Sequence, residues 1–322
     1  MLGFMPVSDA DQAGQPLLLH SLEEFRDLIL EWLDLAGVRT IVEIGSESGA
    51  MTHTLGRWAA EREGHLHSVE PSPGPEVVKL DEESDRFTLV QGLSPDALEG
   101  IPPCDAYVVD GDHNNWVVTR ELETIYAEGR RPLAILHDVG WPCARRDQYY
   151  APHLLPPEAV HPHSWDRGKV LDSPELVEGG FRGPLDFASA QVEGGPRNGV
   201  LTAVEHFLST RDGLLYRHIP AIFGVGVIFP SDAPYAGDLE RVLEPLHENP
   251  LLDKLERNRI RMLLSLIQAR EAPQTLDAVR NRLVAEYDAR LSELEAENAR
   301  LRLEAVRLQA AEAARADIAE RL

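Results

Sequence analysis

Short apolar segments alternate with amphipathic ones over the first 138 residues. Strand-like apolar runs occur at 40–45, 65–71, 87–92, 105–112 and 133–138. Between some of these runs, near 50–62 and 114–129, the apolar positions recur at helical spacing. Strands buried on both faces and joined by helical crossovers produce this alternation. The pattern predicts an α/β fold with a doubly wound, mostly parallel sheet.

The predicted sheet is completed later in the chain. A helical segment at 199–210 precedes two further apolar runs, 214–222 and 224–230, which are joined by a tight turn. Because so short a connection joins only antiparallel strands, we expect a seven-stranded sheet with an antiparallel last strand. Residues 1–20 are polar and read as a loose leader, so the domain is predicted to span 21–230.

The segment 139–198 interrupts this rhythm. It is rich in Pro, Gly, His and aromatic residues and has no clear period, which is typical of a functional insertion or of disorder. We expect a lid that contributes to acceptor binding, although simple packing of its aromatic side chains onto the sheet is the alternative. The candidate acceptor-binding residues are Trp141, Arg145, Arg146, Tyr149, Tyr150, His161, His163 and Trp165.

Two helical regions follow the predicted domain, an extension at 231–275 and a long Ala/Glu/Arg/Leu-rich segment at 276–322. In the second, apolar residues recur at 3–4–3–4 spacing, which predicts a coiled coil and a homodimer. Asn298 at an a position favours a parallel two-stranded coiled coil between two copies of the chain. The alternative is that the helix packs antiparallel onto the helices of 238–270 in its own chain. The seam is Val284, Tyr287, Leu291, Leu294, Asn298, Leu301, Ala305 and Leu308.

The composition narrows the possible partners. The chain has 31 basic and 54 acidic residues, a formal net charge of −23. Such a chain repels phosphate backbones and anionic membranes, so nucleic acid is an unfavourable partner. Two cysteines cannot form a disulfide framework, and neither a membrane-spanning apolar run nor a signal peptide is evident. We therefore expect a cytoplasmic protein.

The loop after the first strand indicates the class of cofactor. It contains Gly45 and Gly49, but Glu47 stands where a dinucleotide-binding loop has its second glycine. A carboxylate beside a diphosphate is unfavourable, whereas a cationic cofactor tolerates acidic neighbours. Glu43 ends the first strand, and Glu70 ends the second where it can accept hydrogen bonds from ribose hydroxyls. The arrangement favours S-adenosylmethionine as the cofactor. The alternative is that Gly45 and Gly49 only shape a tight turn.

Four segments together resemble a known family: TIVEIGSESG, SVEP, VVDGDHNNWVVTRELE and LAILHD, within residues 38–138. They are similar to class I S-adenosylmethionine-dependent methyltransferases with a Rossmann-like sheet. Within them, the DGDH and HD motifs resemble the group of macrolide-sugar O-methyltransferases and cephalosporin-hydroxylase-like proteins. The resemblance implies adenine contacts at the third strand end. The predicted cofactor-binding residues are Glu43, Gly45, Ser46, Gly49, Glu70, Gly92, Leu93, Ser94 and Asp110.

Acidic and imidazole side chains follow the fourth and fifth strands. Because ligands bind at the carboxyl ends of parallel strands, we expect the side chains that follow these strands to converge: Asp110, Asp112, His113, His137 and Asp138. Asp110, Asp138 and His137 are candidate ligands for Mg²⁺ or Mn²⁺, which would lower the pKa of an acceptor hydroxyl. Members of the resembled family commonly have two adjacent acids after the fifth strand, where this chain has His137 and Asp138. Alternatively, Asp110 binds the methionine moiety and His113 only closes the turn.

The predicted catalytic residues are His113, His137 and Asp138, with an imidazole as the base that removes the hydroxyl proton. The function predicted is metal-assisted O-methylation of a sugar, glycan or natural-product acceptor. Two alternatives belong to other functional classes of protein. One is a non-catalytic methyltransferase-fold scaffold that presents its coiled coil, and the other is a nucleotide-dependent oxidoreductase, which Glu47 disfavours.

Overall fold

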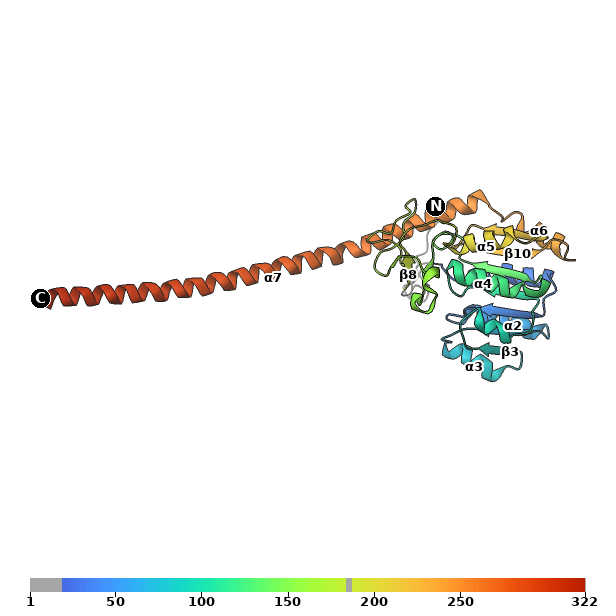
Figure 1. The fold of residues 1–322 in the computed structure, drawn as a ribbon, viewed down its shortest axis with the longest axis horizontal. Helices are drawn as coiled ribbons and strands as arrows, with labels where there is room; N and C mark the ends of the chain where they lie inside the picture. Colours follow the sequence, from blue (N-terminus) through green and yellow to red (C-terminus); the bar gives the residue numbers. More distant parts are fainter. Residues whose placement is uncertain (1–18, 184–186, 322) are drawn as a thin grey trace, which may run out of the picture. The chain divides into compact units, whose positions relative to one another are not determined.

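The computed structural model describes residues 19–183 and 187–321. The chain divides into two compact units, Met1–Ser265 and Leu266–Leu322. The first holds a seven-stranded sheet with helices on both sides, and the second is part of one long helix (Figure 1). None of the helices among the described residues combines the length and apolar character needed to cross a membrane.

The main sheet has the strand order β3-β2-β1-β4-β5-β10-β9. β10 pairs antiparallel with both β5 and β9, and the remaining pairs are parallel, so the prediction of a mostly parallel seven-stranded sheet with an antiparallel last strand is confirmed. The strand order reverses between β1 and β4, which places a crevice at their carboxyl ends. The strands are β1 (Thr40–Ile44), β2 (His65–Val69), β3 (Phe87–Val90), β4 (Ala106–Val109), β5 (Leu133–His137), β9 (Leu214–Ile219) and β10 (Val225–Pro230).

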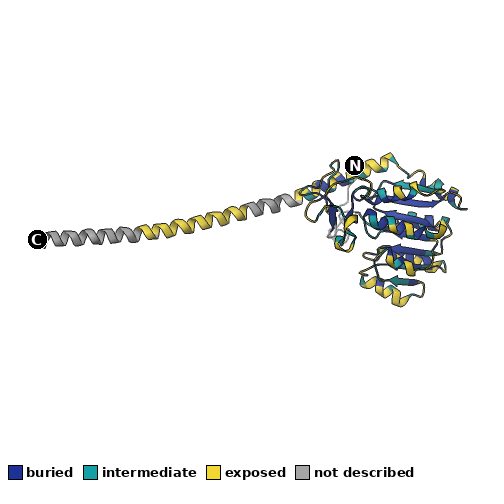
Figure 2. Ribbon diagram, viewed as in Figure 1, coloured by how far each residue is buried: buried dark blue, intermediate teal, exposed yellow. Residues whose placement is uncertain are grey.

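Helices cover both faces of the sheet because both faces carry apolar side chains. On one face, Trp32, Leu55 and Leu239 from α1, α2 and α6 join a core that includes Ile41 of β1. Val204 and its neighbours on α4 and α5 build the second core on the other face. The buried strands appear as a dark band inside the helices (Figure 2). The helices are α1 (Arg26–Leu35), α2 (Ala50–Glu61), α3 (Pro75–Glu83), α4 (Asn115–Ile125), α5 (Val200–Ser209), α6 (Ala236–Leu243) and α7 (Pro250–Arg321).

The insertion between β5 and α5 has more regular structure than its sequence suggested. Three short strands form a separate sheet in the order β6-β8-β7. Buried Asp147 ties this sheet to the main fold, because one carboxylate oxygen accepts hydrogen bonds from the Asn115 amide (2.8 Å) and the Gly199 amide (2.6 Å). The strands are β6 (Gln148–Tyr149), β7 (His163–Ser164) and β8 (Ala188–Ala190).

One helix was not predicted, and one predicted helix is interrupted. The short polar segment after β2 is occupied by α3, with Pro75 at its start. Val77 is its one buried residue. The segment 240–270 was expected to be helical throughout, whereas the chain breaks between α6 and α7. Single helical turns of 3-10 type occur at Leu22–Phe25, Asp96–Gly100, Ala127–Gly129, Pro152–Leu154 and Pro157–Ala159.

The second unit is the remainder of α7. The heptad residues whose side chains are described are exposed, including Leu291 (55 %) and Leu294 (53 %). Figure 2 shows this stretch of α7 as exposed. The side chains of Ala305 and Leu308, the last two seam positions, lie outside the described residues. A single copy of the helix thus leaves its described apolar seam residues exposed to solvent.

Candidate active site

The turn after β1 requires glycine at its first position. Gly45 has φ +86°, and a Cβ built there would lie 2.2 Å from the backbone carbonyl oxygen of Asp110. The β1 and β4 ends approach this closely because the Asp110 amide donates to the Ile44 carbonyl at 2.8 Å. Gly49 (φ +82°) begins α2 against Val77. The two glycines therefore hold the backbone of the strand ends at the crevice.

A groove of about 460 Å³ lies beside this turn. Glu70 borders it, and its carboxylate accepts hydrogen bonds from the backbone amides of Ser46 (3.0 Å) and Ser72 (2.9 Å). The insertion supplies part of the opposite wall through Tyr150 and Leu154. Of the predicted cofactor-binding residues, this groove brings together Gly45, Glu70, Gly92, Leu93, Ser94 and Asp110.

A second, smaller cavity of about 90 Å³ adjoins the groove. Gly45, Glu47, Asp110 and Tyr150 line both spaces, so the two meet at these residues. Predicted residues Glu43 and Ser46 line only the cavity, and Gly49 lines neither. The remaining cavity walls include His113, His137, Asp138, Gln148 and the aromatic residues Phe181, Phe187 and Phe223.

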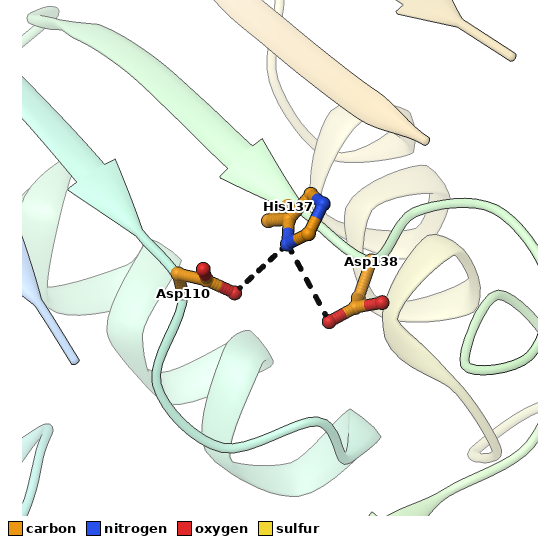
Figure 3. Close-up of side chains that lie close together, drawn as sticks. All are labelled: Asp110, His137 and Asp138. Atoms are coloured by element: carbon orange, nitrogen blue, oxygen red, sulfur yellow. Dashed lines mark hydrogen bonds and ion pairs between the residues drawn. The ribbon is translucent and has the colours of Figure 1, made fainter. Parts of the chain in front are cut away.

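Four of the five side chains predicted to converge, Asp110, His113, His137 and Asp138, line this cavity, whereas Asp112 lines the groove. His137, the last residue of β5, has its Nδ1 3.1 Å from Asp110 Oδ1 and 3.7 Å from Asp138 Oδ2 (Figure 3). Its other ring nitrogen, Nε2, lies 2.9 Å from the backbone oxygen of Ile222. Burial alone would lower the pKa of His137, but the two carboxylates outweigh burial and raise that pKa to about 10.

His113 has a different environment from His137. Its Nδ1 lies 3.3 Å from Asp138 Oδ2, so one carboxylate contacts both imidazoles. The ring packs near Tyr150 and Phe187 at the cavity wall. No hydrogen-bond partner for its Nε2 is found within residues 19–183 and 187–321. His113 is therefore the imidazole that has a ring nitrogen available to a bound molecule.

Most of the insertion residues singled out for acceptor binding lie elsewhere. Among them only Tyr150 lines the cavity. Arg145 pairs with Glu205, and Arg146 is buried with hydrogen bonds to backbone oxygens. Trp141 packs on Phe181 and Phe223, which makes it part of the wall behind the cavity. The remaining candidates, Tyr149, His161, His163 and Trp165, do not border the cavity.

Several wall residues were not recognised from the sequence. Ile222 and Phe223 have positive φ (+46° and +65°) in the β9–β10 connection, an uncommon conformation that directs the Ile222 carbonyl to His137. Gln148 and the buried Lys169 behind it were also missed. The one sequence feature that could have drawn attention to Lys169 is that it is the single lysine of the insertion. Its contact with Gln148 depends on the fold.

Comparisons with known proteins agree with this geometry. Residues 42–136 match a family model described as a methyltransferase domain. A search of curated protein sequences gives no significant match.

Solved structures that resemble the chain include an O-methyltransferase from Bacillus cereus in complex with S-adenosylhomocysteine. It is 14% identical, with 68% of this chain and 86% of that chain covered and a TM-score of 0.39. An O-methyltransferase from Streptomyces achromogenes involved in tomaymycin synthesis is 15% identical, with coverages of 68% and 85% and a TM-score of 0.40.

The family match covers the strands β1 to β5 almost completely, and these strands build the groove and the cavity. The strand order and the glycine turn are those of a Rossmann-like fold, and the part of the chain that builds most of the site, residues 42–136, matches a methyltransferase domain.

Proposed function

We propose that this protein is an O-methyltransferase that acts on a hydroxyl of a sugar, glycan or natural-product acceptor. One observation carries the proposal: the cofactor groove and the cavity share Gly45, Glu47, Asp110 and Tyr150. A methyl donor in the groove and an acceptor in the cavity would meet at that junction, as in-line transfer requires. S-adenosylmethionine supplies the electrophilic methyl group when bound.

The residues of the groove have distinct roles in this proposal. Glu70 accepts hydrogen bonds from ribose hydroxyls, while the Gly92–Ser94 segment borders the adenine. Ser46, Gly49 and Glu43 support the turn, and the Glu43 carboxylate is held by a 2.9 Å hydrogen bond from Ser68 Oγ. Burial raises the pKa of Glu43 to about 7, so this acid adds less negative charge to the site than Asp110.

We propose that His113 is the general base and that Asp138 orients the His113 ring. The Asp138 carboxylate lies 3.3 Å from Nδ1 of His113 and favours a proton there, which leaves the Nε2 lone pair to take the acceptor proton. His137, also predicted as catalytic, has both ring nitrogens engaged, by Asp110 and by the Ile222 carbonyl. In this proposal His137 therefore holds the two carboxylates in place and does not remove a proton.

Asp110, His137 and Asp138 also have the arrangement needed to bind a divalent cation. One ligand atom each from Asp110, His137 and Asp138 lie within 4.8 Å of one another. With its Nε2–H donated to Ile222, His137 would present the Nδ1 lone pair, as metal-bound imidazoles usually do. A bound Mg²⁺ or Mn²⁺ would lower the pKa of an acceptor hydroxyl. Two carboxylates and one imidazole favour Mn²⁺ over Mg²⁺.

The cation is tested by direct binding. Titration of the metal-free protein with Mn²⁺, followed by electron paramagnetic resonance, is expected to show one site that Asp138→Asn weakens at least tenfold, because a ligand is lost. Asp172→Asn, which alters an exposed acid away from the cluster, is the control. Equal affinity in the wild type and Asp138→Asn, or full methyl transfer in EDTA, would remove the cation from the proposal.

Glu70→Ala is expected to weaken S-adenosylhomocysteine binding about tenfold or more. The substitution removes the charged acceptor placed for the ribose, and hydrogen bonds to charged groups contribute roughly 1.5–3 kcal/mol each. Isothermal titration calorimetry measures the change. Glu76→Ala, an exposed acid on α3, serves as the matched control. An unchanged dissociation constant in Glu70→Ala would place the ribose elsewhere.

We further propose that the exposed seam of α7 pairs with a second copy to form a homodimer. Leu291, Leu294 and Leu301 stay more than half exposed in one chain, and Asn298 suits a parallel two-stranded coil. Light scattering should give a dimer for the full chain and a monomer for a version ending at Glu271. The same number of chains per particle for both versions would contradict the dimer. A cytoplasmic location is proposed because both cysteines are free.

The insertion is proposed to cover the bound acceptor and exclude water. Deleting 139–198 is a poor test of that role, because Tyr150 and Leu154 also line the cofactor groove. Complete removal would therefore disturb cofactor affinity as well as acceptor binding. Single substitutions at the cavity wall separate the two effects better.

A further inference from the structure

A buried lysine lies directly behind the catalytic cavity. Lys169 belongs to the insertion, where its backbone exchanges two 2.8 Å hydrogen bonds with Phe181, and its residue surface is 2% exposed. Within residues 19–183 and 187–321, no carboxylate forms an ion pair with its ammonium group. Burying an ammonium group without a charged partner is unfavourable. Burial lowers the pKa of Lys169 to about 8, so the group is still mostly protonated at pH 7.

This lysine determines which way the Gln148 amide points. Lys169 Nζ lies 2.5 Å from Gln148 Oε1, and the Cys143 thiol donates to the same oxygen at 3.3 Å. An ammonium group only donates hydrogen bonds, so the atom that faces it has to be the amide oxygen. The usual ambiguity between the oxygen and nitrogen of a glutamine amide is thereby removed. The Nε2 group points the other way.

The Nε2 group faces the wall of the cavity. A Cβ built on Gly183 would lie 3.3 Å from Gln148 Nε2 and 2.7 Å from the Phe187 ring, so the three are close neighbours. All three residues line the cavity. Among the residues described, no group accepts a hydrogen bond from Nε2. Two N–H donors are thus presented at a cavity wall beside the aromatic ring of Phe187.

We propose that Gln148, oriented by Lys169, recognises a carbonyl-type oxygen on a flat, ring-bearing acceptor. The inference rests on the proposed function, because it takes the cavity as the place where the acceptor binds. Tyr150, Phe181, Phe187 and Phe223 supply aromatic walls that suit a ring. The acceptor hydroxyl lies toward His113 and Asp138, and the second oxygen lies toward Gln148. The size of the cavity, about 90 Å³, admits the reacting end of the acceptor.

A purely structural role for Gln148 predicts a different residue. If the side chain served only to satisfy Lys169, a glutamate would do so better, because it would add an ion pair to the buried ammonium. A glutamate would also direct an oxygen into a cavity that already contains Asp110 and Asp138. Glutamine is the residue of this shape that satisfies Lys169 and still presents donors to the cavity.

The sharpest variant is Gln148→Glu, which keeps the shape, pairs with Lys169 and replaces the two donors by an acceptor. Dissociation constants are measured with S-adenosylhomocysteine at saturation for three probes, each as its three ring isomers. Hydroxyacetophenones carry a carbonyl oxygen, ethylphenols lack it, and aminophenols carry a donor. For at least one isomer, wild type should bind the ketone about five- to tenfold more tightly than the ethylphenol, since a buried amide–carbonyl hydrogen bond is made.

In Gln148→Glu that preference should disappear, and the aminophenol should gain affinity. Lys169→Met, in which the amide is free to rotate, should reduce the preference without abolishing binding of the ethylphenol. Gln191→Glu adds the same charge at an exposed position of the insertion and should change nothing. An identical preference in wild type and Gln148→Glu would overturn the inference, as would failure of every probe to bind the wild type.

The proposed function and the recognition of the acceptor oxygen by Gln148 give different outcomes in this experiment. If S-adenosylhomocysteine itself does not bind, the proposed function is wrong. If it binds normally but the probe preference does not depend on Gln148, only the recognition of the acceptor oxygen is wrong.

Discussion

Replacing His113 by glutamine is expected to lower kcat for methyl transfer by about 10²–10⁴-fold, the usual contribution of a general base. Glutamine retains a polar side chain of similar reach but cannot take a proton. His113 is assigned this role because its Nδ1 contacts Asp138 while its Nε2 has no partner among the described residues. Affinity for S-adenosylhomocysteine should be unchanged, since His113 lines the cavity and not the groove.

The measurement uses tritiated S-adenosylmethionine and any hydroxyl acceptor that the wild type methylates. Asp138→Asn should also be slow, because the carboxylate that orients His113 is lost. His153→Gln, in a surface turn of the insertion, is the matched control. If His113→Gln retains wild-type kcat, the proton is removed by another group or directly by solvent.

Gly45→Ala is expected to destabilise the fold by about 3 kcal/mol, near the top of the usual range for one substitution, and to abolish cofactor binding. The added Cβ would lie 2.2 Å from the Asp110 carbonyl oxygen, so the β1 and β4 ends have to separate. That separation displaces residues that line both the groove and the cavity.

Gly37→Ala is the matched control for the backbone conformation. Gly37 has a similar positive φ of +65°, but nothing lies within 4 Å of a Cβ built there. It should cost only about 1 kcal/mol, the steric penalty of the left-handed region. Urea unfolding and calorimetric titration compare the two variants. Equal destabilisation would mean that crowding at the strand ends is unimportant.

The features predicted from sequence are those with a local signature. The strand runs, the hairpin of β9 and β10 and the meeting of Asp110 with His137 and Asp138 all follow from apolar patterning and from the rule for strand ends. Glu70 was likewise expected at the groove from its place after β2. Each of these depends on neighbours a few residues away or on the order of strands in a parallel sheet.

The features that were missed depend on contacts distant in sequence. His137 Nε2 is engaged by Ile222, which is 85 residues further along the chain. Gln148 is oriented by Lys169, which lies 21 residues further along the insertion. The insertion has no clear apolar period from which the pairing of β6, β7 and β8 could be predicted. Helix α3 was not predicted because its segment is mostly polar and buries a single residue, Val77.

The central claim, that the groove beside Gly45 and Glu70 takes S-adenosylmethionine, is tested most directly by calorimetric titration of the full chain with S-adenosylhomocysteine and with NAD. The account predicts one site per chain of micromolar affinity for S-adenosylhomocysteine and no measurable heat with NAD. Binding of NAD alone would indicate an oxidoreductase. Binding of neither would leave a methyltransferase-fold scaffold and contradict the account.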